Sequence, residues 1–136
     1  MTKVIASPFC PRSEEPASPA LQNGDFVFIS GIYSSKSTLE EQLQECIKQI
    51  KSLLREANHS LKDIVRLTYY VKNEEDLIEI DDLLYDYFEA PYPTRSIVFV
   101  DGLKEDAKIC LDVDSYHLNQ RCSNCSGCSK REIDNE

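Results

Sequence analysis

The chain has 136 residues, the usual length of one domain with a single hydrophobic core. Its formal net charge of −9, from 24 acidic and 15 basic residues, repels the phosphates of nucleic acids and so argues against nucleic-acid binding. The apolar runs are too short to span a bilayer, and residues 1–16 lack the pattern of a signal peptide. We therefore expect a soluble cytoplasmic protein with no membrane partner.

The first half of the chain predicts short strands followed by a helix. A strand near residues 3–6 precedes an irregular stretch rich in Pro and Ser, and an Asn-Gly turn at 23–24 then joins two strand-like runs into a hairpin. After a polar loop, Ser37 and Glu40 form a capping-box pattern. Apolar residues then recur at helical spacing to about Ala57, which predicts an amphipathic helix.

The second half predicts a strand, a helix and two further strands. The stretch DIVRLTYYVK alternates between apolar and polar residues, which places Val65 and every second residue after it on the buried face of a strand. Asn73 is a candidate cap for a helix that runs to about Phe88. The apolar run that begins after Arg95 gives the next strand, and AKICLDVDSYH gives the last.

These elements predict an α+β domain in which two helices pack on one face of a sheet. The central strands are apolar on both faces, because Phe26 and Phe28 point to one side and Val27 and Ile29 to the other. Since two helices cover one face only, we expect the second face to be buried against another copy of the chain. The alternative is that a curled sheet or a loop covers it within the monomer.

The domain should occupy residues 1–117, and the small polar residues at 118–136 predict a mobile tail. The tail contains CSNCSGC, in which three cysteines have a spacing that allows thiolates to converge on one metal ion. With His117 they would form a tetrahedral zinc site; the alternative is a loose segment of oxidisable thiols. No other cofactor is expected. The cysteines of this candidate site are Cys122, Cys125 and Cys128.

Several segments together resemble the RidA/YjgF family of reactive-intermediate deaminases. They are GDFVFISG, EEQLQECIKQIKSLL, SLKDIVRLTYYVKNEEDL, YDYF, PTRSIVFVDGL and KICLDVD. The resemblance covers residues 16–114, and PTRS before an apolar strand is its most specific element. It implies a chorismate-mutase-like fold with a mixed sheet, assembled as a homotrimer with sites in the clefts between subunits.

The resemblance implies that Arg95 binds a substrate carboxylate. In the family, the arginine of this motif holds an imine or enamine such as 2-iminopropanoate, which water hydrolyses to a keto acid and ammonia. A guanidinium presents two parallel donors that match a carboxylate. The alternative is that Arg95 only pairs with one of the acids of its own assembly. The further substrate-binding residues implied are Ser30, Gly31, Asp81 and Ile97.

Three positions depart from the family pattern, and the first is Ala17, where the family usually has a tyrosine. Asp81 stands where the family usually has an asparagine, and Cys110 stands where active members have a glutamate that positions water and relays protons. A thiol, with a reference pKa of about 8.5, is a poor substitute for a carboxylate. Asp112, the nearest acid on the same strand face, lies about 6.6–6.8 Å further along. Cys110 is then either a nucleophile activated by a nearby cation or a small, half-buried strand residue.

The sequence leaves two main hypotheses about function. In the first, a RidA-like trimer binds small carboxylate metabolites, namely 2-imino, enamine or 2-keto acids, and hydrolyses 2-iminopropanoate-type imines, although the position of Cys110 leaves turnover open. In the second, the protein is a non-catalytic member that binds a small ligand or acts through protein partners. A ribonuclease or translation inhibitor is a third hypothesis, against which the acidic charge argues.

Overall fold

The computed structural model describes residues 2–118, and it contains a six-stranded sheet and two α-helices. Most of the predicted tail, including its three cysteines, lies outside the described residues. The strands are β1 (Thr2–Ile5), β2 (Ala20–Asn23), β3 (Phe26–Ile32), β4 (Ile64–Val71), β5 (Thr94–Phe99) and β6 (Ile109–Tyr116). The helices are α1 (Leu39–Glu56) and α2 (Leu77–Tyr85).

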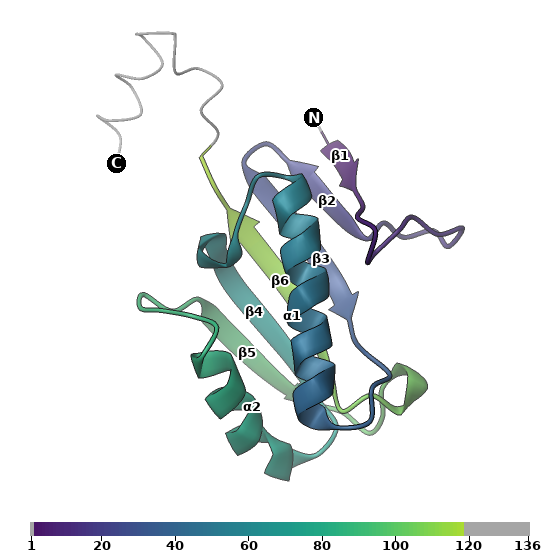
Figure 1. The fold of residues 1–136 in the computed structure, drawn as a ribbon, viewed down its shortest axis with the longest axis vertical. Helices are drawn as coiled ribbons and strands as arrows, with labels where there is room; N and C mark the ends of the chain where they lie inside the picture. Colours follow the sequence, from purple (N-terminus) through teal and green to yellow (C-terminus); the bar gives the residue numbers. More distant parts are fainter. Residues whose placement is uncertain (1, 119–136) are drawn as a thin grey trace, which may run out of the picture.

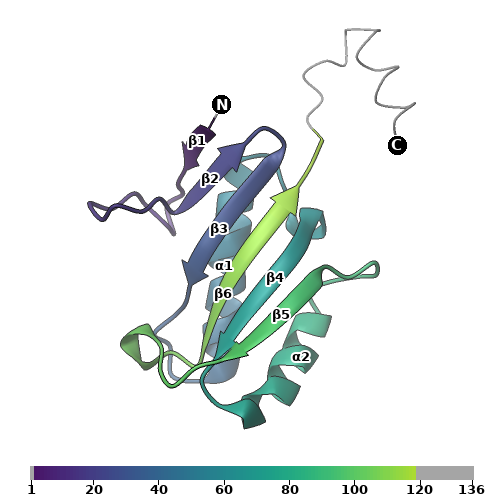
Figure 2. The same ribbon diagram turned by 180° about the vertical axis from the view of Figure 1, so that it is seen from behind.

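The sheet has the strand order β1-β2-β3-β6-β4-β5. Its neighbouring strands are antiparallel except β4 and β5, which are parallel and are connected through α2. Both helices lie on one face of the sheet, in front of it in Figure 1 and behind it in Figure 2. The predicted α+β fold, a mixed sheet with two helices on one face, is therefore confirmed. No helix among residues 2–118 is long and apolar enough to cross a membrane.

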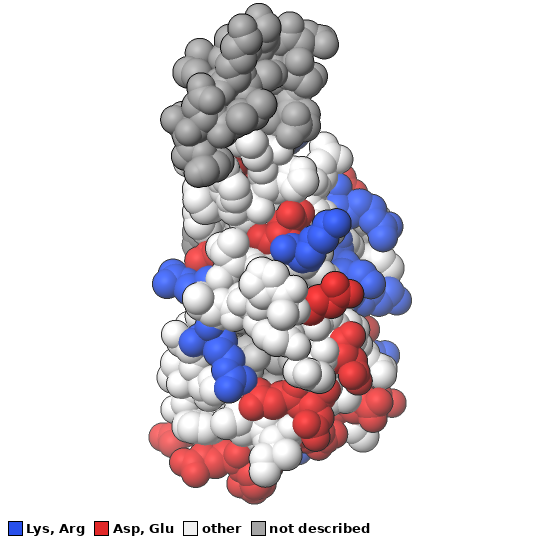
Figure 3. All heavy atoms as spheres, turned by 90° about the vertical axis from the view of Figure 1, so that its left-hand side faces the viewer, with Lys and Arg blue, Asp and Glu red and all other residues white. Residues whose placement is uncertain are grey.

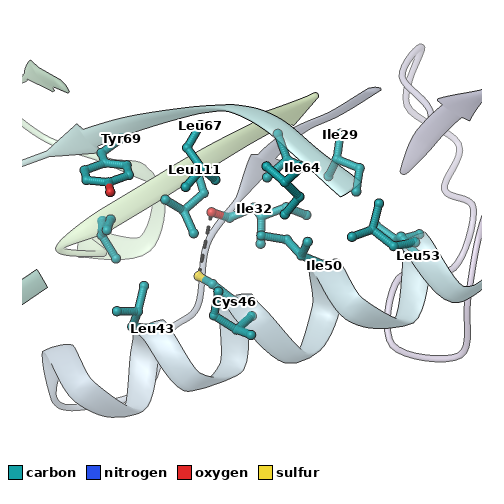
Figure 4. Packing of buried hydrophobic residues seen from close by; sticks show 14 of the residues in the cluster. Ile29, Ile32, Leu43, Cys46, Ile50, Leu53, Ile64, Leu67, Tyr69 and Leu111 are labelled. Carbon is teal, nitrogen blue, oxygen red and sulfur yellow. Dashed lines mark hydrogen bonds between the residues drawn. The ribbon is translucent and has the colours of Figure 1, made fainter. Parts of the chain in front are cut away.

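The hydrophobic core lies between α1 and the sheet. Leu43, Ile50 and Leu53 of the helix are fully buried and face Leu111 and the neighbouring strand residues (Figure 4). Cys46 belongs to this core: its thiol donates to the Ile32 carbonyl at 3.8 Å, and burial raises its pKa to about 12. It is thus a neutral packing residue.

The first turn of α1 differs from the prediction by one residue. Thr38, and not Ser37, is the N-cap, and its hydroxyl accepts the backbone N–H of Glu41 at 3.2 Å. Either hydroxyl suits a helix start. With Thr38 as the cap, Leu39 becomes the first helical residue and is buried in the core, which explains why the helix begins there.

The second helix is shorter than predicted at both ends. Asn73 does not cap it; its side-chain amide contacts Asp76 at 3.4 Å across a 3₁₀ turn, and α2 begins after this turn. The helix ends at Tyr85, before Phe88. Phe88 still packs against the core from the following loop, so the apolar spacing marked buried residues correctly but not the length of the helix.

The alternation in β4 is interrupted at its start. Val65 was predicted to be buried but is exposed, and Ile64 is buried in its place. The pairing of β4 with β6 shifts register between Ile64 and Arg66, which is the signature of a bulge that adds one residue and reverses the alternation. From Leu67 onward, the predicted side is the buried one.

The face of the sheet without helices, which we call the open face, carries exposed aromatic residues. Phe26 and Phe28 of β3 are 43% and 41% exposed, and Phe26 lies against Tyr116 with ring centroids 5.0 Å apart. Their neighbours Val27 and Ile29 are buried on the helix face. The prediction that the central strands are apolar on both faces holds for β3 only, because the open face of β6 and β4 carries Asp112, Asp114 and Thr68. Figure 2 shows no helix over this face.

Candidate functional site

Arg95 is the second residue of β5, and its side chain lies on the helix face beside α2. Its Nη1 donates to the Asp81 carboxylate of α2 at 2.6 Å, and its guanidinium carbon lies 5.9 Å from the centre of the Tyr69 ring. The Arg95 side chain is 46% exposed and that of Asp81 is 37% exposed. The guanidinium is thus oriented by two neighbours but remains open to a solute.

A hollow of about 340 Å³ opens beside this ion pair, between α2 and the strands β4 and β5. Leu67 and Leu84 are buried at its floor. Burial also raises the pKa of Tyr69, although Arg95 opposes the shift, so its hydroxyl stays protonated at neutral pH. The remaining lining residues are Tyr85, Phe88, Tyr92 and Pro93.

A second polar group lies on the open face around Asp112. One carboxylate oxygen accepts the Gly31 N–H at 2.8 Å, and the other accepts the Tyr70 hydroxyl at 2.9 Å. Gly31 has a φ of +70°, in the left-handed region that favours glycine, at a register shift between β3 and β6. These bonds fix the backbone at Ser30 and Gly31, two of the predicted binding residues.

Cys110 pairs with Tyr70 across β6 and β4 and also lies on the open face. Burial raises the pKa of its thiol, and the negative charge of Asp112 raises it further. The thiol is therefore protonated at neutral pH, which argues against a nucleophilic Cys110 in this chain. Within one chain, Arg95 lies on the opposite face of the sheet and does not lower this pKa.

The predicted site residues fall into two groups on opposite faces of the sheet. Arg95 and Asp81 are on the helix face, together with Ile97, which pairs with buried Tyr69. Ser30, Gly31 and Cys110 are on the open face. Because the sheet separates the two groups, a small ligand bound to Arg95 cannot reach the open-face residues of the same chain. A site that contains both groups needs a second copy.

His117, the predicted fourth zinc ligand, belongs to a cluster at the end of β6. Its Nδ1 lies 3.1 Å from the Asp63 carboxylate, and its ring centroid is 5.7 Å from that of His59. His59 is buried and its Nδ1 bonds the Ser115 hydroxyl at 2.8 Å. Residues 2–118 contain no group of three or more side chains placed to hold a metal. The cysteines proposed as ligands, Cys122, Cys125 and Cys128, lie outside the described residues.

Sequence reasoning missed the aromatic walls of the hollow. Tyr85 and Tyr92 stack with ring centroids 5.8 Å apart, although one ends α2 and the other follows a loop. The sequence did offer one indication of these walls, namely the many aromatic residues just before PTRS. What it could not show is that the loop after α2 extends past the end of the helix and turns back to begin β5 (Figure 1), which brings Tyr92 against Tyr85.

Comparison with known proteins agrees with this fold. Residues 10–116 match the family model described as Endoribonuclease L-PSP, and the chain belongs to this family. It is 30% identical over 122 residues to a RutC family protein of Pyrococcus abyssi, covering 84% of this chain and 96% of that protein. It is 24% identical over 118 residues to a 2-iminobutanoate/2-iminopropanoate deaminase of Dermatophagoides farinae, covering 81% and 92%.

Among solved structures, the chain is similar to YyfA of Yersinia pestis, which is described as a member of the conserved Rid protein family. The TM-score is 0.81 with 24% identity, over 86% of this chain and 100% of that one. The resemblance to the RidA/YjgF family is therefore confirmed at the level of family and fold.

The buried His59 predicts a pH-dependent stability. Burial lowers its pKa below the value of about 6.5 expected in the unfolded chain. Between these two pKa values the unfolded chain binds the proton more readily, so the free energy of unfolding should fall as the pH is lowered below about 6.5. His59→Gln should reduce this loss when urea unfolding is measured at about pH 7.5 and pH 5.5. An unchanged difference between the two pH values would place the titration elsewhere.

Proposed function

We propose that this protein binds small metabolites that carry a carboxylate, such as 2-imino, enamine or 2-keto acids, with Arg95 as the anchor. The observation that carries the proposal is the half-exposed guanidinium at the edge of a hollow, held by Asp81 and Tyr69. A guanidinium has five N–H donors, more than one carboxylate accepts, so the bond to Asp81 leaves room for a ligand. The deaminase of Dermatophagoides farinae is named for substrates of this class.

We further propose that the complete site lies between copies of the chain in a homotrimer. The open face carries exposed apolar side chains that a partner subunit would bury. It also carries Ser30, Gly31 and Cys110, which reach Arg95 only if they come from another copy. A closed ring of three chains makes each interface equivalent and gives three identical clefts.

Hydrolysis in such a cleft would convert a protonated 2-imino acid and water into a 2-keto acid and an ammonium ion. Water adds to the imine carbon, the nitrogen takes up a proton, and the carbon–nitrogen bond then breaks. This reaction needs a group that positions and deprotonates the water. A thiol at Cys110 lacks the two acceptor oxygens of a carboxylate and is poorly suited to that task, so the proposal is a binding site with slow hydrolysis.

The main alternative is a non-catalytic member of the family that only binds its ligand, and the thiol of Cys110 in place of a carboxylate favours it. A ribonuclease is less well supported. The side of the molecule that carries α2 and β5 has acidic side chains gathered toward its lower end (Figure 3), and the net charge is −9. Phosphate backbones are repelled by such a surface.

The first prediction concerns the anchor. Arg95→Ala should weaken binding of 2-ketobutyrate by about 1.5–3 kcal/mol, tenfold or more, because a charged hydrogen-bonded pair is lost. The measurement is an NMR titration of the full chain. Arg55→Ala, which removes an exposed arginine from the last turn of α1, is the matched control and should bind normally. Equal binding by the Arg95 variant would refute the proposal.

The second prediction concerns turnover. Cys110→Glu should raise hydrolysis of 2-iminopropanoate, because a general acid or base typically contributes about 10²–10⁴-fold. An amino-acid oxidase would generate the imine, and its disappearance would be followed with and without the protein. Cys110→Gln controls for side-chain size without the charge. Rapid hydrolysis by the unmodified chain, unaffected by Arg95→Ala, would be incompatible with this site.

The third prediction concerns assembly. Light scattering should give three times the mass of one chain, and truncation after Leu118 should leave this mass unchanged. Phe28→Asp should reduce the mass, because it places a charge on the exposed apolar surface of β3. A folded, monodisperse monomer from the unmodified chain would rule out the shared cleft.

A further inference from the structure

Asp81 affects which ligand suits the Arg95 hollow, on the premise that the proposed carboxylate site exists. Its carboxylate accepts from the guanidinium at 2.6 Å and is itself partly exposed. A ligand that carries only a carboxylate must approach this second negative charge, and like charges at close range repel. A ligand that also carries a cationic nitrogen meets two matched partners, since the nitrogen can donate to Asp81 while the carboxylate accepts from Arg95.

The surroundings of Asp81 strengthen this preference. The helix that carries it and the 3₁₀ turn before it are rich in acidic residues, among them Glu79 and Asp82. Figure 3 shows acidic side chains gathered toward the lower end of this side of the molecule. The local potential is therefore negative, apart from the guanidinium itself, and it favours a cationic group at Asp81.

The rest of the hollow is apolar and aromatic. Tyr85 and Tyr92 form a stacked pair at its wall, yet they are 67% and 50% exposed. Phe88 lies beside them, and Leu84 is buried at the floor. Exposed aromatic rings that surround a polar group are typical of a ligand site. A volume of about 340 Å³ lies near the lower end of the range of roughly 300–1,000 Å³ for small-molecule sites.

We infer that the hollow takes an α-amino or 2-iminium acid with an aromatic or large apolar side chain, in preference to the smallest members of its class. The carboxylate binds Arg95, the cationic nitrogen donates to Asp81, and the side chain packs between Tyr85, Phe88 and Tyr92. A methyl side chain would be too small to cover the exposed parts of these rings. The inference deepens the proposed function by naming the substrate class of the same site.

Four stable ligands test the inference. Phenylalanine and alanine carry the cationic nitrogen, whereas phenylpyruvate and pyruvate do not. Within each pair, the first compound has an aromatic side chain and the second a methyl group. Calorimetric titration of the full chain should show phenylalanine binding at least about tenfold tighter than alanine, because the aromatic ring is removed from water. Phenylalanine should also bind tighter than phenylpyruvate. Asp81→Asn should abolish this second preference, since the repulsion of the keto acid and the attraction of the ammonium are lost together.

Tyr85→Ala should weaken phenylalanine binding and leave alanine binding unchanged. Ile78→Ala is the matched control: the residue is on the same helix, is 77% exposed and does not line the hollow. It should change neither affinity, and thermal unfolding of both variants would confirm that they remain folded.

The possible failures are distinguishable. If phenylalanine and alanine bind equally and Tyr85→Ala has no effect, the aromatic preference is wrong. If Asp81→Asn leaves the ratio of amino to keto acid unchanged, the role of Asp81 is wrong. In both cases, loss of all binding in Arg95→Ala would uphold the carboxylate site. If no ligand binds, or if Arg95→Ala binds normally, the proposed function itself is overturned together with the inference.

Discussion

Strand β6 lies between β3 and β4, and the alternation of its side chains decides which residues of the sheet face the helices and which face the open side. This strand pairs with β3 on one side and β4 on the other, so it sets which side chains of both neighbours share a face. Ile109, Leu111 and Val113 point into the core under the helices. Cys110 and Asp112 must then point to the open face, because successive side chains of a strand alternate.

The same alternation determines what kind of site the chain can build. Register with β4 places Arg95 on the helix face, opposite buried Leu67, where α2 brings Asp81 against the guanidinium. One chain therefore has Arg95 and the aromatic hollow on the helix face. On the open face it has Gly31 and its hydrogen bond to Asp112. The helix-face group has the carboxylate anchor, and the open-face group has Gly31 and Cys110. The two groups can form one site only if a second copy packs against the open face and buries it.

Periodicity in the sequence was sufficient to predict the strands, the two helices and the face they cover, because burial follows directly from the spacing of apolar residues. Periodicity was insufficient where the exposure or pairing of a residue depends on an element far away in the sequence. The exposure of Val65 comes from a bulge against β6, a strand far away in the sequence. The ion pair between Arg95 and Asp81 depends on how α2 packs, and the sequence offered pairing of Arg95 with an acid only as an alternative, without Asp81 as the partner. The choice of Thr38 over Ser37 depended on burying Leu39.

The most direct test is a crystal structure of the full chain grown with 2-ketobutyrate. The carboxylate of the ligand should lie within about 2.7–3.0 Å of the Arg95 guanidinium, in a cleft that a second copy closes with its Gly31 and Cys110. A ligand bound away from Arg95, or a closed site made by one chain alone, would contradict this prediction.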